Sequence, residues 1–384
     1  MAVGTELRIR NFGQIGDVNL TFGDLTILVG AQGTGKSLAL QWLKAVMDGR
    51  QVVSALREAG AGQNVSKAEV LVDLIFGVGM GSAWRDDSEV LFNGASIKPA
   101  GISRLGNGKE SAFFIPAHRS MLISDGWASP FQKLTSDVPV VARIFSQNLF
   151  ERFSARSGDK LFPLERVLKK EYRDLIDEAV YHGGTVALEE DRQHTKRMKL
   201  THGDSQLPFM TWTAGQREFT PLLLGLYHLL PPRKLVKQPH IDWVIVEEPE
   251  MGLHPQAISV VILLTLDLLW RGYRVVVSTH SPHVATALWM LRRLQQHRAR
   301  WQLLCKAFEV RQSQQIQRVA EAALGKAYCT YFLQFDRTGK VSSRDISELS
   351  PDSEDEAESG WGGLTGFSSR FAEVVREAVN ESET

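Results

Sequence analysis

Eight residues, GAQGTGKS from Gly30 to Ser37, constrain the fold of this chain more strongly than any other stretch. They follow the apolar run LTILV and precede a segment in which Leu38, Trp42 and Val46 recur at helical intervals. The octet fits the pattern G-x-x-x-x-G-K-[ST], whose glycines let backbone N–H groups converge on phosphate oxygens at a helix N-terminus. The sequence therefore predicts a strand, a phosphate-binding loop and a helix, in that order.

Several side chains of this loop receive a role from the pattern. Lys36 is expected to reach the β- and γ-phosphates of ATP, and Ser37 to bind Mg²⁺. The alternative is a glycine-rich turn without a ligand, and the position of the octet between a predicted strand and a predicted helix argues against it. The other residues expected to contact the nucleotide are Gly30, Gln32, Gly33, Thr34 and Gly35.

A second apolar strand ends in two acids. The stretch WVIVEEPEMGLHP places Glu247 and Glu248 at the carboxyl edge of the sheet, where α/β folds bind their ligands. By position, we expect Glu247 to hold Mg²⁺ and Glu248 to orient and deprotonate water. The next predicted strand, YRVVVSTH, ends at the same edge, so His280 is expected to contact the γ-phosphate. The alternatives are an exposed acidic strand end and a structural histidine.

The stretch TWTAGQREFTPLLLGL offers a second helix start with small residues. Thr213 is suited to cap this helix, and Gly215 permits a close backbone approach. Because one nucleotide cannot occupy both helix starts, we expect Thr213, Ala214, Gly215 and Gln216 to cover a nucleotide held by a second copy of the chain. The pattern thus predicts a head-to-tail homodimer with ATP between the subunits. An ordinary capped amphipathic helix is the alternative.

Taken together, these stretches resemble the ABC-type ATPase heads of the SMC, RecF and OLD group. The resemblance covers roughly residues 5–48, 111–119 and 205–340, and the elements GLHP and FFIPAHR point to the OLD-like branch. Glu247 stands where Asp is commoner in the family, and Gln32 replaces a frequent Asn. The resemblance implies the following parts: Walker A at 30–37, the signature at 213–216, the Walker B acids Glu247 and Glu248, the D-loop region at 251–254, and the switch histidine His280.

The expected fold class is α/β: an ABC-type P-loop NTPase head with a mixed sheet core, an N-terminal antiparallel β subdomain and an inserted helical lobe. We place the N-terminal half of the head at 1–119, the lobe with a β annex at 120–204, and the C-terminal half at 205–340. Residues 341–384 form an acidic tail and a short C-terminal helix, and SPDSEDEAES in this tail predicts a disordered spacer. Weak strands are expected near Phe308 and over 331–335.

Missing features narrow the function. Only 177 residues separate Ser37 from Gly215, without sustained heptads, and no Glu with a following Asp-x-Asp cluster occurs after STHSP. The chain therefore contains neither a long coiled coil nor a TOPRIM nuclease. The resemblance then implies an Mg²⁺-dependent ATPase that acts as sensor or scaffold subunit, as in bacterial anti-phage systems such as PARIS or Septu. Its expected partners are a separate TOPRIM or HNH effector nuclease and a triggering phage protein.

Two other functions stay open. One is a RecF-like DNA-binding clamp, with basic stretches at 194–199 and 291–301 and Trp301 as a stacking group. The other is a structural module that binds ATP without turnover. Lys plus Arg and Asp plus Glu number 44 each, so no overall basic field favours direct DNA binding.

The expected compartment is the cytoplasm. Two cysteines, Cys305 and Cys329, cannot form a disulfide framework. The N-terminal stretch MAVGTELRIRNFGQ lacks the apolar core of a signal peptide. The longest apolar run, Val260–Trp270, is short and contains Asp267, so it predicts a buried helix and no membrane segment.

Overall fold

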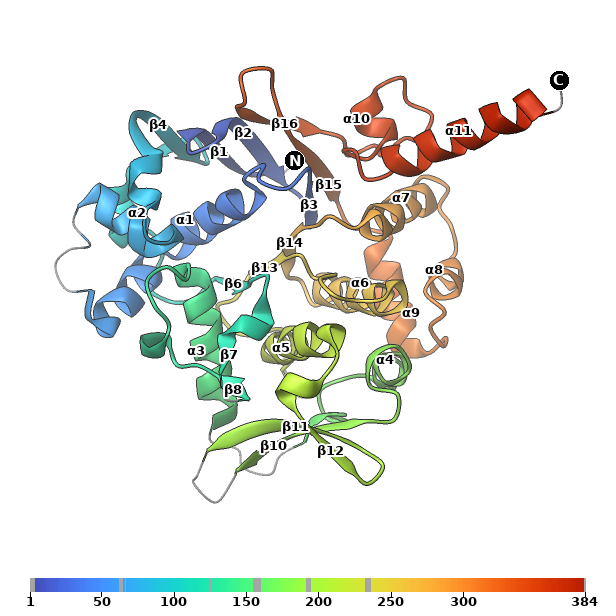
Figure 1. Cartoon of the computed structure of the whole chain (residues 1–384), viewed down its shortest axis with the longest axis horizontal. Coiled ribbons are helices and arrows are strands. Elements are labelled where there is room, and N and C mark those ends of the chain that lie inside the picture. The colour runs from blue at the N-terminus through green and yellow to red at the C-terminus, as the bar shows by residue number, and fades with distance from the viewer. Residues whose placement is uncertain are drawn as a thin grey trace.

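A ten-stranded mixed sheet forms the centre of the computed structural model, which describes residues 4–61, 65, 67–124, 126–154, 160–190, 195–231 and 236–382 (Figure 1). Its strand order is β5-β4-β1-β2-β16-β15-β3-β14-β13-β6. Five neighbouring strands run parallel, and most of their β-branched and aromatic residues are buried, on both faces of the sheet, with Phe335 as an exposed exception. These strands are β6 (Ala112–Ile115), β13 (Trp243–Glu247), β14 (Arg274–Ser278), β3 (Leu25–Val29) and β15 (Tyr328–Phe335).

The other half of the sheet is largely antiparallel. Two hairpins, β1-β2 and β4-β5, pair through β1 and β4 and give the order β5-β4-β1-β2. The strand β16 joins them to the parallel half, because it pairs parallel with β2 and antiparallel with β15. The predicted mixed sheet with an N-terminal antiparallel β subdomain is confirmed. These strands are β1 (Thr5–Phe12), β2 (Ile15–Phe22), β4 (Trp84–Phe92), β5 (Ala95–Ile97) and β16 (Val341–Asp345).

Two hydrophobic cores lie on the two faces of the parallel strands, as the period-two alternation of a strand requires. Along β13, Val244 and Val246 pack into one core, while Ile245 packs into the other. The first core includes α5 (Ala214–Leu229), α6 (Pro255–Trp270) and α7 (Pro282–Gln296). The second core includes α1 (Lys36–Leu56) and α2 (Ala68–Phe76). The sheet is therefore covered by helices on both sides. Because its central strands run parallel, the loops that follow their carboxyl ends lie at one edge.

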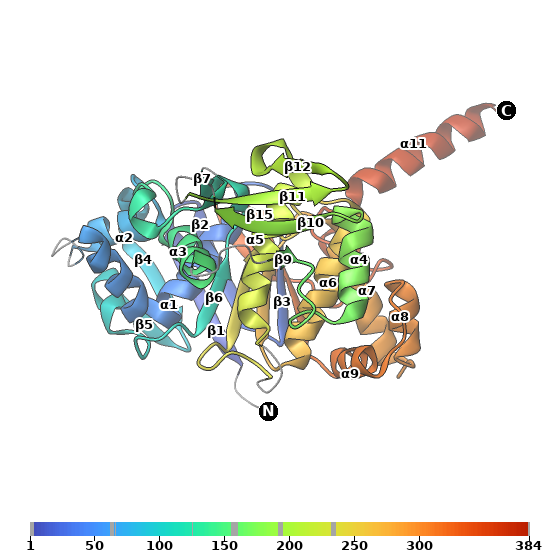
Figure 2. The ribbon, with the colours of Figure 1, turned by 90° about the horizontal axis from the view of Figure 1, so that it is seen from below.

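The inserted lobe mixes helices with a small sheet (Figure 2). Its sheet has the order β12-β11-β10-β9, and β10 pairs antiparallel with β11 where a β annex was expected. A two-stranded sheet of β7 and β8 lies beside it. The lobe elements are β7 (Ile123–Ser124), β8 (Trp127–Ala128), α3 (Val140–Ser154), β9 (Lys160–Phe162), α4 (Lys170–Ile176), β10 (Thr185–Glu190), β11 (Lys196–His202) and β12 (Ser205–Pro208).

Three expectations for the last quarter of the chain are wrong. The stretch before Phe308 is a helix, α8 (Gln302–Ala307), and not a strand. Residues 341–345 form β16 and belong to the sheet, not to the tail. The acidic segment is folded, because the Asp355 carboxylate caps α10 (Glu356–Ser359) and forms an ion pair with Arg344.

The end of the chain is anchored by one aromatic residue. The Trp361 indole N–H donates to the Leu349 carbonyl at 3.0 Å and its ring lies 6.3 Å from the ring of Trp289. Beyond it, α11 (Gly366–Ser382) extends away from the body (Figures 1 and 2). Within the described part of the chain, no helix combines the length and the apolar character needed to cross a membrane. The remaining helix, α9 (Gln314–Ala323), packs against α6.

Candidate functional site

The loop between β3 and α1 has the backbone of a phosphate cradle. Gly30, Gly33 and Gly35 have φ values of 145°, 76° and 78°, which L side chains rarely adopt. A Cβ on Gly30 would lie 2.2 Å from the Leu333 carbonyl oxygen on β15, so only glycine fits there. The helix α1 begins at Lys36, directly after this turn. The loop therefore presents its N–H groups at a helix N-terminus, as phosphate binding requires.

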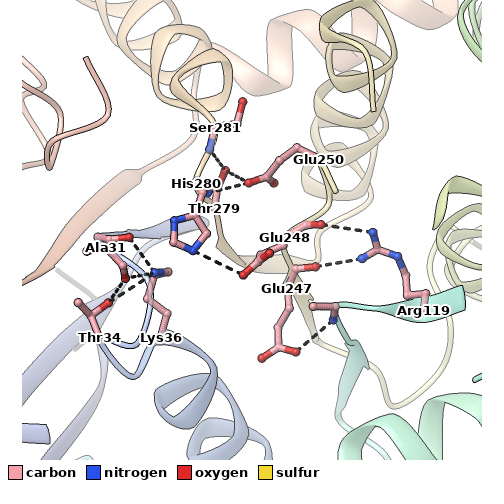
Figure 3. Close-up of polar contacts among 12 residues, drawn as sticks. Ala31, Thr34, Lys36, Arg119, Glu247, Glu248, Glu250, Thr279, His280 and Ser281 are labelled. Carbon is pink, nitrogen blue, oxygen red and sulfur yellow. Dashed lines mark hydrogen bonds and ion pairs between the residues drawn. The ribbon is translucent and has the colours of Figure 1, made fainter. Parts of the chain in front are cut away.

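Lys36 lies within this loop rather than in solvent. Its Nζ donates to the carbonyl oxygens of Gly30 at 2.8 Å and Ala31 at 2.9 Å (Figure 3). Burial lowers the pKa of Lys36 to about 8, although the carboxylates of Glu248 and Glu250 act in the opposite direction. A partly desolvated cation of this kind gains from an anionic partner, and the phosphate groups of a nucleotide would supply one.

Glu247 is a buried carboxylate with spare capacity for a cation. Its Oε2 accepts from the Ala117 N–H at 3.2 Å, whereas its buried Oε1 has no hydrogen-bond partner among the described residues. Burial raises the pKa of Glu247 to about 7, against the effects of the Ala117 N–H and the Ser37 hydroxyl, and the neighbouring Glu248 raises it further. An unpartnered buried oxygen beside a hydroxyl provides the hard oxygen ligands that Mg²⁺ prefers, so the residues present fit this ion.

Glu248 and His280 face each other at the ends of β13 and β14. The His280 Nε2 lies 3.5 Å from the Glu248 Oε1, and both side chains are 30% exposed (Figure 3). Glu248 has a φ of 40°, a rare conformation for a non-glycine residue, and its N–H donates to the Ser278 carbonyl at 2.9 Å. The pKa of His280 is lowered by burial and by the Lys36 ammonium. A neutral imidazole can offer one N–H to an oxygen in the pocket.

One open pocket of about 530 Å³ joins most of the predicted residues. That volume lies within the range of about 300–1,000 Å³ typical of ligand sites. Three further residues line it that sequence reasoning did not select: Gln14, Leu38 and His118. Met251, from the expected D-loop region at 251–254, lines it as well. The predicted residues that line it are Gln32, Gly33, Thr34, Gly35, Lys36, Ser37, Glu248 and His280.

The signature-like turn does not line this pocket. Thr213 caps α5 in a capping box with Gln216, and both Thr213 and Ala214 are exposed. A Cβ on Gly215 would lie 2.8 Å from the Gly252 carbonyl oxygen, so this turn packs backbone to backbone against the segment 251–254. The helix start at 213–216 is therefore exposed at Thr213 and Ala214, and none of its four residues lines the pocket at residues 30–37.

Arg119 is a buried residue of the site that sequence reasoning missed. Its guanidinium is fully buried and donates to the carbonyl oxygens of Glu247 at 3.0 Å and Glu248 at 3.3 Å (Figure 3). It also lies 3.7 Å from the Glu218 carboxylate. Burial lowers its pKa, while these carboxylates act in the opposite direction. The one available signal was an arginine directly after the apolar strand in FFIPAHR.

Glu250 is the second missed residue. Its Oε1 accepts from the Thr279 hydroxyl and from the His280 backbone N–H, both at 2.7 Å. These two bonds fix the turn that carries the imidazole relative to the strand end that carries Glu248. A third acid in EEPE was the signal for this residue in the sequence.

The basic stretches considered for DNA binding are partly used by the fold. Arg292 donates to the Tyr328 carbonyl at 3.0 Å and pairs with Glu348, and Trp301 is half-buried. Lys199 pairs with Glu189 at 2.6 Å, and His194 lies outside the described residues. Neither stretch therefore presents all of its cations to a ligand.

Comparison with known proteins bears on the second half of this site. A family described as "AAA domain, putative AbiEii toxin, Type IV TA system" matches residues 159–286, a span that holds the signature-like turn, both acids and His280. No curated protein matches the chain. The matched span is 128 of the 384 residues and does not include the loop at residues 30–37.

Several solved structures are similar to this chain at low identity. The SMC head domain from Thermotoga maritima is 12% identical with a TM-score of 0.38, and the similarity covers 88% of this chain and 97% of that one. An Smc head domain bound to the C-terminal domain of ScpA, derived from Pyrococcus furiosus, is 11% identical with a TM-score of 0.41, covering 88% and 95%. A dimeric ATP-binding cassette in a post-hydrolysis state, bound to ADP and Pi, is 11% identical with a TM-score of 0.34, covering 72% and 89%.

Proposed function

We propose that this chain is an Mg²⁺-dependent, ABC-type ATP phosphohydrolase. The observation that carries the proposal is that a buried acid and an accessible acid lie next to each other at the phosphate cradle. A buried Glu247 with an unpartnered oxygen lies beside Ser37 of the phosphate cradle, and an accessible Glu248 lines the pocket above it. One acid is thus suited to a metal ion and the other to a water molecule, as phosphoryl transfer to water requires.

The roles of the chain's own residues follow from this placement. Lys36 and the loop N–H groups hold the β- and γ-phosphates in position. Mg²⁺, when bound by Ser37 and Glu247, would neutralise charge on the phosphate oxygens. Glu248 orients the attacking water and accepts its proton. His280, with its pKa lowered by burial and by Lys36, donates a hydrogen bond towards the γ-phosphate oxygens. Arg119 fixes the main chain that carries both acids.

The exposed turn at 213–216 completes the proposal. It presents a capped helix start with small residues to solvent, and it does not line the pocket of the same chain. A second copy of the chain, placed head to tail, would bring this turn over the nucleotide held at residues 30–37. The residues Thr213, Ala214, Gly215 and Gln216 would then contact the γ-phosphate across the dimer interface.

The Glu248→Gln variant tests the enzymatic proposal. We expect phosphate release to fall by about 10²–10⁴-fold, because the proton acceptor is lost, while ATP binding is retained. Phosphate release and equilibrium nucleotide binding are measured side by side. Glu348→Gln, which neutralises an exposed glutamate outside the pocket, is the matched control and should keep full activity. Turnover by Glu248→Gln at the wild-type rate would refute the assignment.

The cellular role that we propose is that of a sensor or scaffold subunit in bacterial anti-phage defence. Its ATP-bound state would hold or release a separate effector nuclease of TOPRIM or HNH type, in response to a phage protein. The description of the matched family, which names a putative toxin and a type IV toxin–antitoxin system, supports a two-component arrangement. Glu248→Gln with MgATP should retain such a nuclease in a pull-down from host cells. Retention of replication or recombination proteins instead would favour the RecF-like clamp.

A further inference from the structure

A second pocket, of about 470 Å³, is lined by an unusual number of cations. Four segments distant in sequence contribute to it: the residues that lead into and begin α4, Pro231 with Val236, the C-terminal end of α6, and the first turns of α9. Its aromatic residue is Trp270, and its one carboxylate on the lining is Glu165. We call it the basic pocket, and its cationic residues are Arg166, Lys169, Lys170, Arg173, Arg271 and Arg318.

The basic pocket lies at the opposite edge of the sheet from the ATP site. The strand β13 ends at Glu247, and α6 then runs back across the sheet before β14 begins at Arg274. Trp270 is therefore at the amino edge of the parallel strands, about 24 Å along a 16-residue helix from Pro255. In Figure 1, α4 and α9 lie beside α6, and both pack against it. A ligand here would be separate from the nucleotide at Lys36.

Two of the six cations are held in place by one buried acid. The Asp267 carboxylate accepts from the Lys169 Nζ at 2.7 Å and lies 3.5 Å from the Arg271 Nε. The Lys169 Nζ also lies 4.9 Å from the centre of the Trp270 ring, and the Arg271 guanidinium 5.5 Å from it. One carboxylate thus balances one of two fixed positive charges at the base of the pocket, and the other charge is uncompensated.

Three further cations have no polar partner in the part of the chain that the structure describes. Among the described residues, Arg166, Lys170 and Arg318 make no hydrogen bond or ion pair, and all three are exposed. Arg173 donates only to the Leu168 carbonyl, at 3.2 Å, which leaves its positive charge without a counter-ion. Positive charge therefore exceeds negative charge in this concavity, in a chain whose overall net charge is zero.

This arrangement differs from an ordinary solvated basic face. Like charges repel, so cations on a surface normally spread apart, whereas here three elements direct them into one hollow. Arginine guanidinium groups form paired hydrogen bonds with phosphate oxygens, and such bonds are among the strongest that a surface site can make. The pocket is compact and not an extended stripe, which suits a small polyanion better than a nucleic-acid backbone.

We propose that the basic pocket binds a small, multiply charged phosphate compound, with Arg166, Lys170 and Arg318 as its main ligands and Lys169 and Arg271 at its base. The phosphate groups could be those of a free polyphosphate or of a nucleotide. The site goes beyond the ATPase function, because it uses none of the residues of the ATP pocket.

Tripolyphosphate titrated into the full chain by calorimetry tests the proposal. The ATP pocket is first filled with a non-hydrolysable ATP analogue, with Mg²⁺ in excess, so that only a second site can report. Wild type should bind one equivalent. Arg166→Glu/Arg318→Glu should bind at least tenfold more weakly, because two charge-assisted contacts are lost. Arg85→Glu/Arg300→Glu makes the same charge change at exposed arginines outside the pocket and should bind like wild type.

Competition experiments distinguish a free polyphosphate from a nucleotide as the natural ligand. Displacement by pyrophosphate alone indicates a free polyphosphate, and displacement also by ADP indicates a nucleotide. Equal affinity of the two double variants, or no binding to wild type, overturns the proposal. So does binding of a 20-base-pair DNA duplex that depends on Arg166 and Arg318 while tripolyphosphate does not bind. Lys170→Glu replaces the double variant if circular dichroism shows that the latter is unfolded.

Discussion

At the scale of single residues, the site depends on buried charges whose partners are mostly backbone groups. Arg119 donates to carbonyl oxygens of Pro116, Glu218 and both strand-end acids, so one guanidinium ties three segments together. Strand-end position was enough to predict Glu247 and Glu248 from the sequence. Arg119 could not be predicted in the same way, because the carbonyl groups that it contacts, apart from that of Pro116, lie about 100 to 130 residues further along the chain.

Replacing Arg119 by methionine should therefore be strongly destabilising. The change removes the donor of several buried carbonyls and the positive charge beside the Glu218 carboxylate, which, of the residues that the structure describes, keeps only the Ser120 N–H and hydroxyl as donors. We expect the free energy of unfolding to fall by about 3–5 kcal/mol. Urea denaturation of the apo chain measures this. Adding Glu218→Gln should recover about 1 kcal/mol, because it removes the unpaired charge. A double variant whose cost equals the sum of the two single costs would show that the pair is not coupled.

His228 should make stability depend on pH. Burial and the Arg152 guanidinium lower its pKa to about 4, whereas an unfolded histidine titrates near about 6.5. Between these values the unfolded chain binds a proton that the folded chain does not. The contribution of neutral His228 to the free energy of unfolding is therefore complete above about pH 6.5 and is lost as the pH falls towards 4.

The matched variant for this effect is His228→Gln. Between pH 7.5 and pH 5.0, wild type should lose about 2 kcal/mol more of its unfolding free energy than the variant does. Urea denaturation at the two pH values provides the comparison. Identical pH dependence of the two proteins would mean that His228 is not held neutral by the fold.

At the scale of elements, periodicity and strand-end residues predicted the parts that have strong local signals. The strands around Val29, Val246 and Val277 and the helices that follow the first two are where the sequence placed them. Composition and local pattern gave wrong predictions of secondary structure where tertiary contacts determine it. The acidic segment is folded because Asp355 caps a helix and binds Arg344, and the apolar stretch before Phe308 suited a helix as well as a strand.

The contact between the signature-like turn and the segment 251–254 should tolerate no side chain. A Cβ on Gly215 would lie 2.8 Å from the Gly252 carbonyl oxygen, so Gly215→Ala must push the two turns apart. We expect ATPase activity to fall at least tenfold, with a stability cost of about 1–3 kcal/mol. Phosphate-release assays and urea denaturation measure the two effects.

Gly101→Ala is the control for this substitution, because a Cβ there has nothing within 4 Å and the backbone is not left-handed. It should change neither activity nor stability measurably. Wild-type activity in Gly215→Ala would mean that the packing of these two turns has no part in turnover.

At the scale of the whole molecule, the sequence indicated how the two halves of the head combine, because the phosphate loop and the strand-end acids need one sheet edge. The basic pocket could not be predicted from the sequence. Its cations are spread over residues 166 to 318 and meet only because α4 and α9 pack on α6. Assembly is likewise a property of the whole molecule. The turn at 213–216 and the pocket at residues 30–37 are separate surfaces of one chain, so only a second chain can bring them together.

Light scattering of Glu248→Gln with saturating MgATP tests this central claim most directly. The account predicts a particle with twice the mass of the chain, which reverts to the monomer when Mg²⁺ is chelated. It also predicts that adding Gly215→Ala to the same variant weakens the dimer. A monomer that nevertheless binds one ATP per chain would contradict the shared site.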